Sequence, residues 1–599
     1  MGRGEKDCDT NNFKGGNMKL GKLLSYIAAV SIATVGLQAG TSKMDFAKMY
    51  EKECQGCHGP IHQGGVGSDL RPKALKKKNR EFLAETILNG RENTAMPAWK
   101  DKFTKDDATG MVDWLMDWKN TVELKLDLDK VKETWTKLAD VDALAKKYPV
   151  AKDGTLKYKG AEVANVKDIT FATERDASLV DFIDSTKGQV LSRHKAGFAV
   201  HVTVTNKHNP RYAYSISRSG RLTMFDIGAP GQPAVASVQV GQESRGLAVS
   251  PDGKYVLAGN YNPGGAVLCD AHTLEPLKAF DTSRVIDPDG QIGPSRVAGI
   301  ADTPYGPYFA MALKDAGHVY IIDYSKPNFP IVGDVPNIGK ILHDCFENEN
   351  EGEDFGRYFM IASQGSDLMG IVDFKTKKLA AKVYTGKKSK PHPGQGSSWF
   401  NKKMGKQLNA TNSMNFGSVV IWDSPSWKVV KKIPTAGGGL FVGTGEHTPW
   451  IWSDCVLGKP DKYNEVHLIN KETLETDRII KVGKTQGQLI DAKTGKVLQT
   501  WDATQHEKVP VNEAKSKLSK ETILPYPTKI GPVVKNPVQP RLLHAEPANH
   551  GKWTMISEWT TGRIGIYDSE TGKFIKYIEN LTTPTFTYSV EHRQHIPGA

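Results

Sequence analysis

The sequence predicts a small all-α domain followed by a long all-β propeller, for which we expect eight blades. Three observations favour this division of the 599 residues. Helical patterns surround a short motif of cysteine and histidine near residue 54. Beyond residue 166 a two-strand unit recurs at regular intervals. The 58 glycines and 32 prolines indicate many turns, as an all-β fold requires.

The recurring unit is an apolar strand that ends in Asp or Asn, then a polar turn and a second β-rich strand, as in LVDFIDSTKGQVL. The turn-starting residues are Asp184, Asp226, Asp270, Asp323, Asp373, Asp423, Asn470 and Asp568. Their first six spacings, 42 to 53 residues, match the blades of a β-propeller, which an irregular β-sandwich does not predict. The last spacing, 98 residues, holds a further copy, GQLIDAKTGKVLQTW. We therefore assign 166–599 to a propeller with an insertion in blade seven or eight, or with a ninth blade.

The motif ECQGCHG places Cys54 and Cys57 three positions apart and His58 directly after the second cysteine. This pattern is typical of covalent heme c attachment, in which the cysteines form thioethers with the porphyrin and the histidine ligates the iron. A zinc site would need a second pair of cysteines. The other four, Cys8, Cys269, Cys345 and Cys455, stand singly, so we favour heme c.

Residues 44–119 have the organisation of a small cytochrome c domain. Apolar residues at helical spacing precede the heme motif, and Thr104 with Asp107 predicts a capping box at the start of a later helix. Between these features Met96 precedes a proline. Because a thioether is a soft ligand suited to heme iron, we expect Met96 as the sixth ligand. The alternatives are His62 or a ligand from another segment.

Residues 1–39 are predicted to be an upstream extension and a secretory signal peptide. Lysines precede an apolar run over 23–37, and small residues follow from Ala39. The first 17 residues are unlike the start of a signal peptide, so we expect translation to begin at Met18. The apolar run is short for a membrane span. Cleavage near Ala39 would leave a periplasmic chain without a membrane span, in the compartment where bacteria attach heme c.

Residues 120–165 are rich in lysine and aspartate, have weak helical patterning, and are expected to form a linker. The formal net charge of +12 is spread along the chain. Short lysine clusters lack interleaved aromatic residues, which argues against a nucleic-acid partner. A basic surface can instead help to dock an acidic electron donor.

Four stretches resemble the cytochrome cd1 nitrite reductase family: ERDASLVDFID, GFAVHVTV, ILHDC and SKPHPGQG. The resemblance extends from the heme motif to LTTPTFTYSV near the end of the chain. It implies an eight-bladed propeller that holds heme d1 on its axis and reduces nitrite to nitric oxide with one electron delivered through heme c. It also implies a small periplasmic electron donor, such as a cytochrome c or a cupredoxin, and a homodimer.

The same resemblance implies the site residues. His201 matches the proximal ligand of the d1 iron. His343 and His392 match the pair above the open face of that iron, which holds nitrite and supplies protons. Imidazoles titrate near neutral pH and therefore suit both tasks. Further residues that match contacts of d1, chiefly with its carboxylates, are Arg175, Arg218, Arg245 and Tyr261.

Two departures from the family pattern keep other functions open. Gln395 stands where an arginine usually follows His-Pro-Gly, and His544 stands where we expect glutamine. A histidine near that place resembles the related dehydrogenase that completes d1 synthesis by oxidising dihydro-heme d1, in which it can bind the d1 iron. That dehydrogenase is the alternative function. A non-enzymatic d1 carrier or electron-transfer protein is the third.

Overall fold

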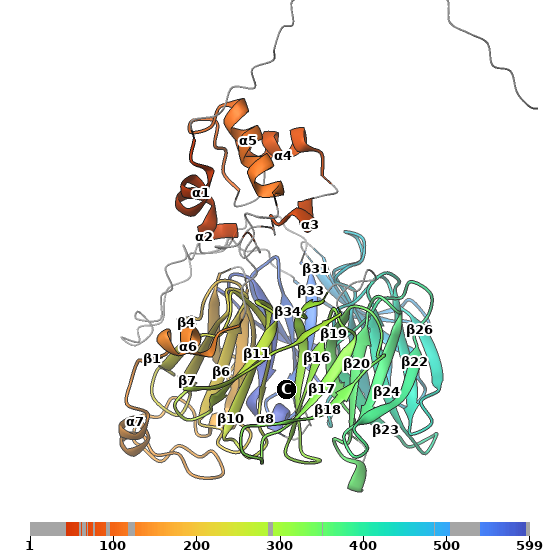
Figure 1. The fold of residues 1–599 in the computed structure, drawn as a ribbon. Helices are drawn as coiled ribbons and strands as arrows, with labels where there is room; N and C mark the ends of the chain where they lie inside the picture. Colours follow the sequence, from red (N-terminus) through yellow and green to blue (C-terminus); the bar gives the residue numbers. More distant parts are fainter. Residues whose placement is uncertain are drawn as a thin grey trace, which may run out of the picture. The chain divides into compact units, whose positions relative to one another are not determined.

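The computed structural model describes residues 44–594, apart from 59–61, 63–67, 69, 76–77, 92–95, 118–125, 176, 286–291, 350–351, 484–485 and 503–539. Helices dominate the first part of the described chain and strands the rest (Figure 1). The predicted extension and signal peptide, 1–39, lie outside the described residues. Among the described helices, none has the length and hydropathy that crossing a bilayer requires.

The helical part is built around the heme motif. Its elements are α1 (Phe46–Met49), a π-helical turn (Tyr50–Cys54), α2 (Gln55–His58), α3 (Pro72–Leu75), α4 (Arg80–Asn89) and α5 (Lys105–Met116). The predicted capping box at the start of α5 is confirmed, since Thr104 and Asp107 satisfy each other's backbone N–H groups. The Phe46 ring of α1 packs closely on α5 at Gly110, and Arg80 of α4 pairs with Asp113 of α5.

The propeller consists of eight antiparallel blades, which confirms the predicted fold and number (Figure 1). The first four blades are β37–β2–β3–β4 (Pro584–Ser589, Ile169–Glu174, Leu179–Asp184, Gln189–Lys195), β5–β8 (Val200–Thr205, Tyr212–Ser217, Arg221–Asp226, Ala234–Gln239), β9–β12 (Glu243–Val249, Tyr255–Asn262, Gly265–Asp270, Pro276–Phe280) and β15–β18 (Val297–Thr303, Tyr308–Leu313, His318–Asp323, Ile331–Val335). A small hairpin, β13 (Ser283–Val285) and β14 (Ile292–Pro294), lies between the third and fourth.

The other four blades are β19–β22 (Leu342–Glu347, Tyr358–Ser363, Leu368–Asp373, Lys378–Tyr384), β23–β26 (Pro391–Asn401, Lys406–Ser413, Ser418–Ser424, Val429–Pro434), β27–β32 (Val442–Gly443, Trp450–Asp454, Glu465–Asn470, Thr476–Val482, Gln486–Asp491, Val497–Asp502) and β33–β36 (Leu542–Ala548, Trp553–Glu558, Arg563–Asp568, Phe574–Ile578). The chain closes the ring when β37 pairs with β2, and α8 (Val590–Gln594) follows. The further sequence copy forms β31 and β32, two extra strands of blade seven, and so does not form a ninth blade.

The recurring Asp or Asn has a local physical role at the turn between the third and fourth strands of a blade. Asp184 accepts hydrogen bonds from the backbone N–H groups of Thr186 and Lys187, and Asp270 accepts the same pattern two and three residues on. Short polar side chains stabilise such turns by replacing backbone acceptors. The repeat in the sequence is therefore a repeat of one capped turn.

Apolar side chains fill the space between neighbouring blades. Phe182 of blade one and Phe225 of blade two, for example, have ring centroids 5.2 Å apart, and both rings are fully buried. Rings on facing sheets pack edge to face at such distances. The blades are thereby fixed relative to one another, and so are the inner strands that carry the candidate site.

Part of the segment that we expected to be a linker packs on the propeller. It contains α6 (Leu128–Glu133), β1 (Thr136–Lys137) and α7 (Val141–Lys147), and a 3-10 turn (Val166–Asp168) follows it. β1 pairs with β8 and adds a fifth strand to blade two, and Val131 is buried in the same core cluster as that blade. The Trp135 indole donates to the carbonyl of Thr273 at 3.0 Å. The weak helical patterning did not reveal these contacts with distant strands.

Candidate heme and active sites

The candidate d1 site lies where the inner strands of the blades begin. His201 is on β5, Arg245 on β9, His343 on β19, His392 on β23 and His544 on β33. In each strand the pairing register with the second strand shifts at or directly beside that residue. Such β-bulges leave a residue unpaired and change the direction of its side chain, and they are common next to active sites.

Close approach of neighbouring blades also positions this region. A Cβ placed on Gly299 of β15 would lie 2.7 Å from the carbonyl oxygen of His343 and 2.6 Å from Sγ of Cys345. Real Cβ atoms do not approach so closely, so glycine at 299 lets blade four contact the bulge of blade five. Cys345 fills this contact between blades, which is a packing role.

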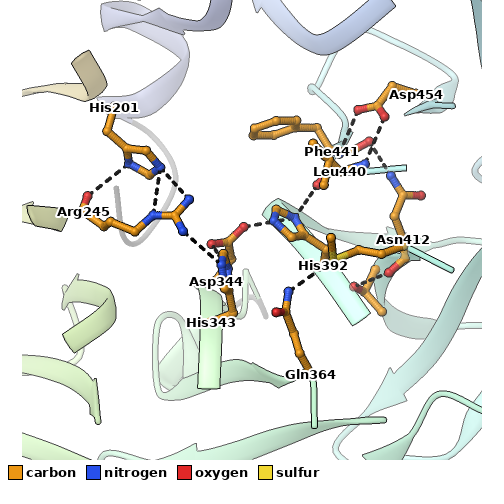
Figure 2. Close-up of polar contacts among 12 residues, drawn as sticks. His201, Arg245, His343, Asp344, Gln364, His392, Asn412, Leu440, Phe441 and Asp454 are labelled. Atoms are coloured by element: carbon orange, nitrogen blue, oxygen red, sulfur yellow. Dashed lines mark hydrogen bonds and ion pairs between the residues drawn. The ribbon is translucent and has the colours of Figure 1, made fainter. Parts of the chain in front are cut away.

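His201 presents one ring nitrogen as an acceptor. Its Nδ1 donates to the backbone carbonyl of Arg245 at 3.2 Å, so the neutral ring has its lone pair on Nε2. Nε2 accepts hydrogen bonds from Nε and Nη2 of Arg245 at 3.2 and 3.0 Å (Figure 2). Burial lowers the pKa of His201 well below its usual value, and Arg245, Arg218 and Arg175 lower it further. A neutral imidazole with its lone pair on Nε2 is the form that iron ligation requires, and Arg245 would release that nitrogen when the iron binds.

One carboxylate joins the two distal histidines. His343 Nδ1 lies 2.6 Å from one oxygen of Asp344, and His392 Nδ1 lies 3.0 Å from the other (Figure 2). His392 Nδ1 also donates to the carbonyl of Leu440 at 2.8 Å, and the two imidazole centroids are 5.0 Å apart. Both Nδ1 atoms face acceptors, so both carry hydrogen. Nε2 is therefore the nitrogen of each neutral ring that carries the lone pair.

Burial and the neighbouring groups of opposite charge shift the pKa of Asp344, and likewise that of His343, in opposite directions. Burial raises the pKa of Asp344, but His392, His343 and Arg245 outweigh burial and hold that pKa well below its usual value. Burial lowers the pKa of His343 to about 3, although Asp344 acts in the opposite direction. The three ligand atoms lie within 4.8 Å of one another, so a single metal ion could also bridge this group. Two imidazoles and a fixed carboxylate thus meet at one point.

Four cationic side chains surround the ring of Tyr261. The guanidinium carbons of Arg218, Arg245 and Arg296 lie 5.9, 5.4 and 5.3 Å from its centroid, and Nζ of Lys314 lies 5.6 Å from it. Glu243 pairs with Arg218, and Asp315 pairs with Arg296. Positive charge therefore exceeds negative charge locally, which suits a ligand with several carboxylates. Arg218, Arg245 and Tyr261 were predicted from the sequence, and the structure brings these three together, whereas Arg175 is seen only to lower the pKa of His201.

Three residues of the site were missed by sequence reasoning. Asp344 follows His343 directly, and a carboxylate beside a candidate acid-base histidine was a signal within the ILHDC stretch itself. Arg296 and Lys314 lie in blade four, where no motif distinguishes them from surface cations. Only the ring of blades brings them to Tyr261 of blade three.

Lys314 should make the affinity of the site for d1 depend on pH. Burial, together with Arg296 and Arg245, lowers the pKa of Lys314 to about 7. A bound carboxylate would favour the charged amine and raise that pKa, so binding above pH 7 would take up a proton. We expect the affinity for d1 to fall as the pH rises through 7, by at most about tenfold per pH unit. Titrations of d1 at pH 6 to 9 test this, and Lys314→Met should abolish the slope in that range.

The two ring nitrogens of His544 have the opposite roles to those of His201. The backbone N–H of Thr587 donates to His544 Nδ1 at 3.1 Å, so the neutral ring carries its hydrogen on Nε2. The side chain is 2 % exposed and packs between the rings of Phe441 and Phe586, with centroids at 4.7 and 4.6 Å. Burial lowers the pKa of His544 well below its usual value. His544 is thus presented as a hydrogen-bond donor, unlike His201.

The heme c motif has the arrangement expected for an iron ligand. Nδ1 of His58 lies 2.7 Å from the carbonyl oxygen of Ser68, which leaves the Nε2 lone pair available. Burial lowers the pKa of His58, which favours the neutral ligating form. Cys54 and Cys57 lie one helical turn apart, and burial raises the pKa of Cys54 to about 11.

The candidates for the sixth ligand of heme c differ in their surroundings. His62 is buried between Tyr50 and Trp114, with ring centroids at 4.3 and 4.8 Å, which is the environment of a core residue. Met96 is half-buried, and its carbonyl accepts a hydrogen bond from the backbone of Arg91 at 3.1 Å. Met96 as the ligand stays a prediction.

Comparison with known proteins identifies the class of this chain. The profile of the cytochrome D1 heme domain matches residues 164–593, and the profile of the cbb3-type cytochrome c oxidase subunit III matches residues 42–115. The chain belongs to the cytochrome D1 heme domain family, preceded by a cytochrome c domain. It therefore binds heme c and heme d1, and the residues fit both groups: neutral His58 and His201 for the irons, and the cations around Tyr261 for the d1 carboxylates.

Two curated relatives correspond to the two candidate enzymatic functions. Dihydro-heme d1 dehydrogenase of Pseudomonas aeruginosa is 28% identical over 461 residues, 76% of this chain and 86% of the relative. Nitrite reductase of Stutzerimonas stutzeri is 28% identical over 470 residues, 72% of this chain and 78% of the relative. The solved structure of the dehydrogenase NirN in complex with DHE covers 91% of this chain and 99% of its own, with a TM-score of 0.64 at 24% identity, which shows the shared fold.

Proposed function

We propose that this protein reduces nitrite to nitric oxide at heme d1, with electrons received through heme c. The observation that carries the proposal is the pair of distal imidazoles, His343 and His392, held by the two oxygens of Asp344. Reduction of nitrite consumes one electron and two protons and releases nitric oxide and water. Two imidazoles beside one another match the two protons in number.

The histidines would act only when the anion arrives. Bound heme d1 supplies the ferrous iron that coordinates nitrite and provides the electron. His343 is neutral in its present surroundings, because its pKa is lowered to about 3. A nearby anion favours the charged form of an imidazole and raises its pKa. Nε2 of His343 and of His392 would then take up protons, donate hydrogen bonds to the nitrite oxygens and transfer the protons to the oxygen that leaves as water.

The surrounding residues have supporting roles in this proposal. His201 holds the d1 iron through Nε2, and Arg175, Arg218, Arg245, Arg296 and Lys314 hold the carboxylates. Asp344 keeps both distal rings in one orientation and offsets the cost of their positive charge. The electron donor would be a small periplasmic cytochrome c or cupredoxin that docks on a basic surface, and the protein would be a periplasmic homodimer.

A second candidate is the oxidation of dihydro-heme d1 to heme d1, which releases two electrons and two protons. The curated dehydrogenase relative and the buried His544 favour it. In the expectation drawn from the sequence, His544 would bind the d1 iron. Its hydrogen bond from the Thr587 backbone puts the hydrogen on Nε2, so ligation would require a change of tautomer. This geometry supports nitrite reduction as the first choice.

His544→Gln distinguishes the two candidates. If the protein reduces nitrite, glutamine keeps a donor in the same place, and we expect turnover within about threefold of the wild type. The absorption spectrum of d1 should also be unchanged, because no iron bond is lost. Loss of a d1 iron ligand, visible as a shift of the d1 bands, together with negligible nitrite turnover in the wild type, would support the dehydrogenase instead.

The direct test gives each candidate substrate to a separate sample of the purified protein. Protein that contains both hemes is given nitrite with a reduced electron donor, and nitric oxide is measured. A second sample, loaded with dihydro-heme d1, is followed for the appearance of d1. Catalytic nitric oxide formation supports the proposal, and stoichiometric d1 formation without nitric oxide supports the second candidate.

A further inference from the structure

A large cavity lies along the second halves of the same inner strands that begin with the distal histidines. Its volume is about 1120 Å³. Phe346 and Glu347 line it from β19, Gln395 and Ser397 from β23, and Glu546 from β33. All three strands also carry a site histidine near their first residues, so the cavity and the distal site lie along the same strands.

Several polar groups in the cavity wall have no hydrogen-bond partner within the protein. Both carboxyl oxygens of Glu347, the hydroxyl of Ser397 and the amide nitrogen of Gln395 are buried in this way. Glu347 and Ser397 are each 2 % exposed. Buried polar groups are nearly always paired with protein or ordered water, so this wall has the chemistry of a water-filled space. Gln395, which replaces an expected arginine, adds a neutral hydrogen-bonding group here.

Two acids of this wall lie on one segment, two residues apart. Burial raises the pKa of Glu349 to about 7, opposed by Arg593 and Lys471. Burial and Asp302 raise the pKa of Glu347 well above its usual value, opposed by Lys207. The other titratable groups that line this cavity are Lys402, Glu446, His447, Glu472, Glu546, His550, Glu591 and His592. Glu349 can thus both bind and release a proton near neutral pH.

We propose that this cavity carries protons between solvent and the distal histidines, with Glu349 and Glu347 as successive carriers and water between them. Water is needed because Glu347 and His343 are too far apart for a direct proton transfer. At about 3.3 Å per strand residue, Glu347 lies roughly 13 Å along β19 from His343, too far for a direct transfer. Hydrogen-bonded water and the side chains of Ser397 and Gln395 would span that interval. The inference rests on the d1 chemistry but serves either candidate reaction, since both move two protons.

The test uses holoprotein in which Glu349 is changed, with matched controls. Glu349→Gln keeps the size and removes the titration, Glu349→Asp restores a carboxyl, and Glu446→Gln removes an exposed carboxylate from the rim of the same cavity. For Glu349→Gln we expect turnover about tenfold lower above pH 7 and an altered pH profile. Glu349→Asp should recover most of the rate, and Glu446→Gln should match the wild type. A wild-type profile in Glu349→Gln would overturn the proposal.

A readout without turnover separates this inference from the proposed function. Infrared difference spectra of the wild type should show one protonated carboxyl that titrates near pH 7 and is missing in Glu349→Gln. If nitrite is not a substrate, proton release during dihydro-heme d1 oxidation, followed with an indicator dye, replaces turnover as the rate measurement. Absence of the titrating carboxyl, or proton release at the wild-type rate in Glu349→Gln, would refute the proton route whichever reaction the protein performs.

Discussion

Replacing His343 or His392 by alanine should lower the rate of nitrite turnover on the order of 10²-fold or more, the usual contribution of a general acid. Each change removes one of the two imidazoles that Asp344 holds, and with it one proton donor and one contact with the anion. The remaining imidazole cannot replace it, because the two rings occupy different positions 5.0 Å apart between centroids. Steady-state nitric oxide production at saturating donor measures the loss.

The control for these variants is His272→Ala. His272 is half exposed and contacts exposed Asp142 at 2.9 Å and the ring of Tyr212, neither of which belongs to the candidate site, so its loss should leave turnover unchanged. Heme c reduction and d1 content should be normal in all three variants, since none of these residues contacts the heme motif or His201 directly in the described structure. Full activity in either distal variant would contradict the assigned roles.

Replacing His201 by glycine should weaken d1 binding by about 100-fold or more. Even the partners of a metal-ligating histidine contribute roughly 10- to 100-fold to metal affinity, and the ligand itself contributes at least as much. The cations around Tyr261 remain and still hold the carboxylates, so partial occupancy at high d1 concentration is expected. Titration of the protein with extracted d1, followed by absorption, measures the affinity.

Added imidazole provides a matched rescue for His201→Gly. The glycine leaves space for a free imidazole, whose nitrogen can ligate the iron in place of the side chain. We expect imidazole to restore the wild-type d1 spectrum and most of the affinity. Unchanged affinity and spectrum in His201→Gly without imidazole would mean that another residue ligates the iron.

The fold could be predicted because every blade repeats the same kind of local turn. A strand ending in Asp or Asn marks a capped turn, and that turn recurs once per blade. The insertion could not be placed from the same signal, because β31 and β32 use an identical capped turn at Asp491 without starting a blade. Pairing of β1 with β8 was also hidden, since strand partners far apart in sequence leave no local pattern.

The site was predictable only in part, for reasons that lie in the backbone. The resemblance supplied His201, His343 and His392, but their convergence depends on register shifts that no periodicity reveals. The tautomer of His544 depends on Thr587, 43 residues further along the chain. Arg296 and Lys314 join the site because blade four lies next to blade three, which is a property of the closed ring.

Nitric oxide production by the wild type, loaded with both hemes and supplied with nitrite and a reduced donor, decides whether the protein is a nitrite reductase. We expect continuous turnover, with one nitric oxide formed per nitrite and per electron consumed. The occupancy of heme c and heme d1 must be measured on the same sample, so that a missing cofactor is not mistaken for a missing activity. Fully loaded protein that forms no nitric oxide, while protein loaded with dihydro-heme d1 converts it to d1, would show that the protein is not a nitrite reductase.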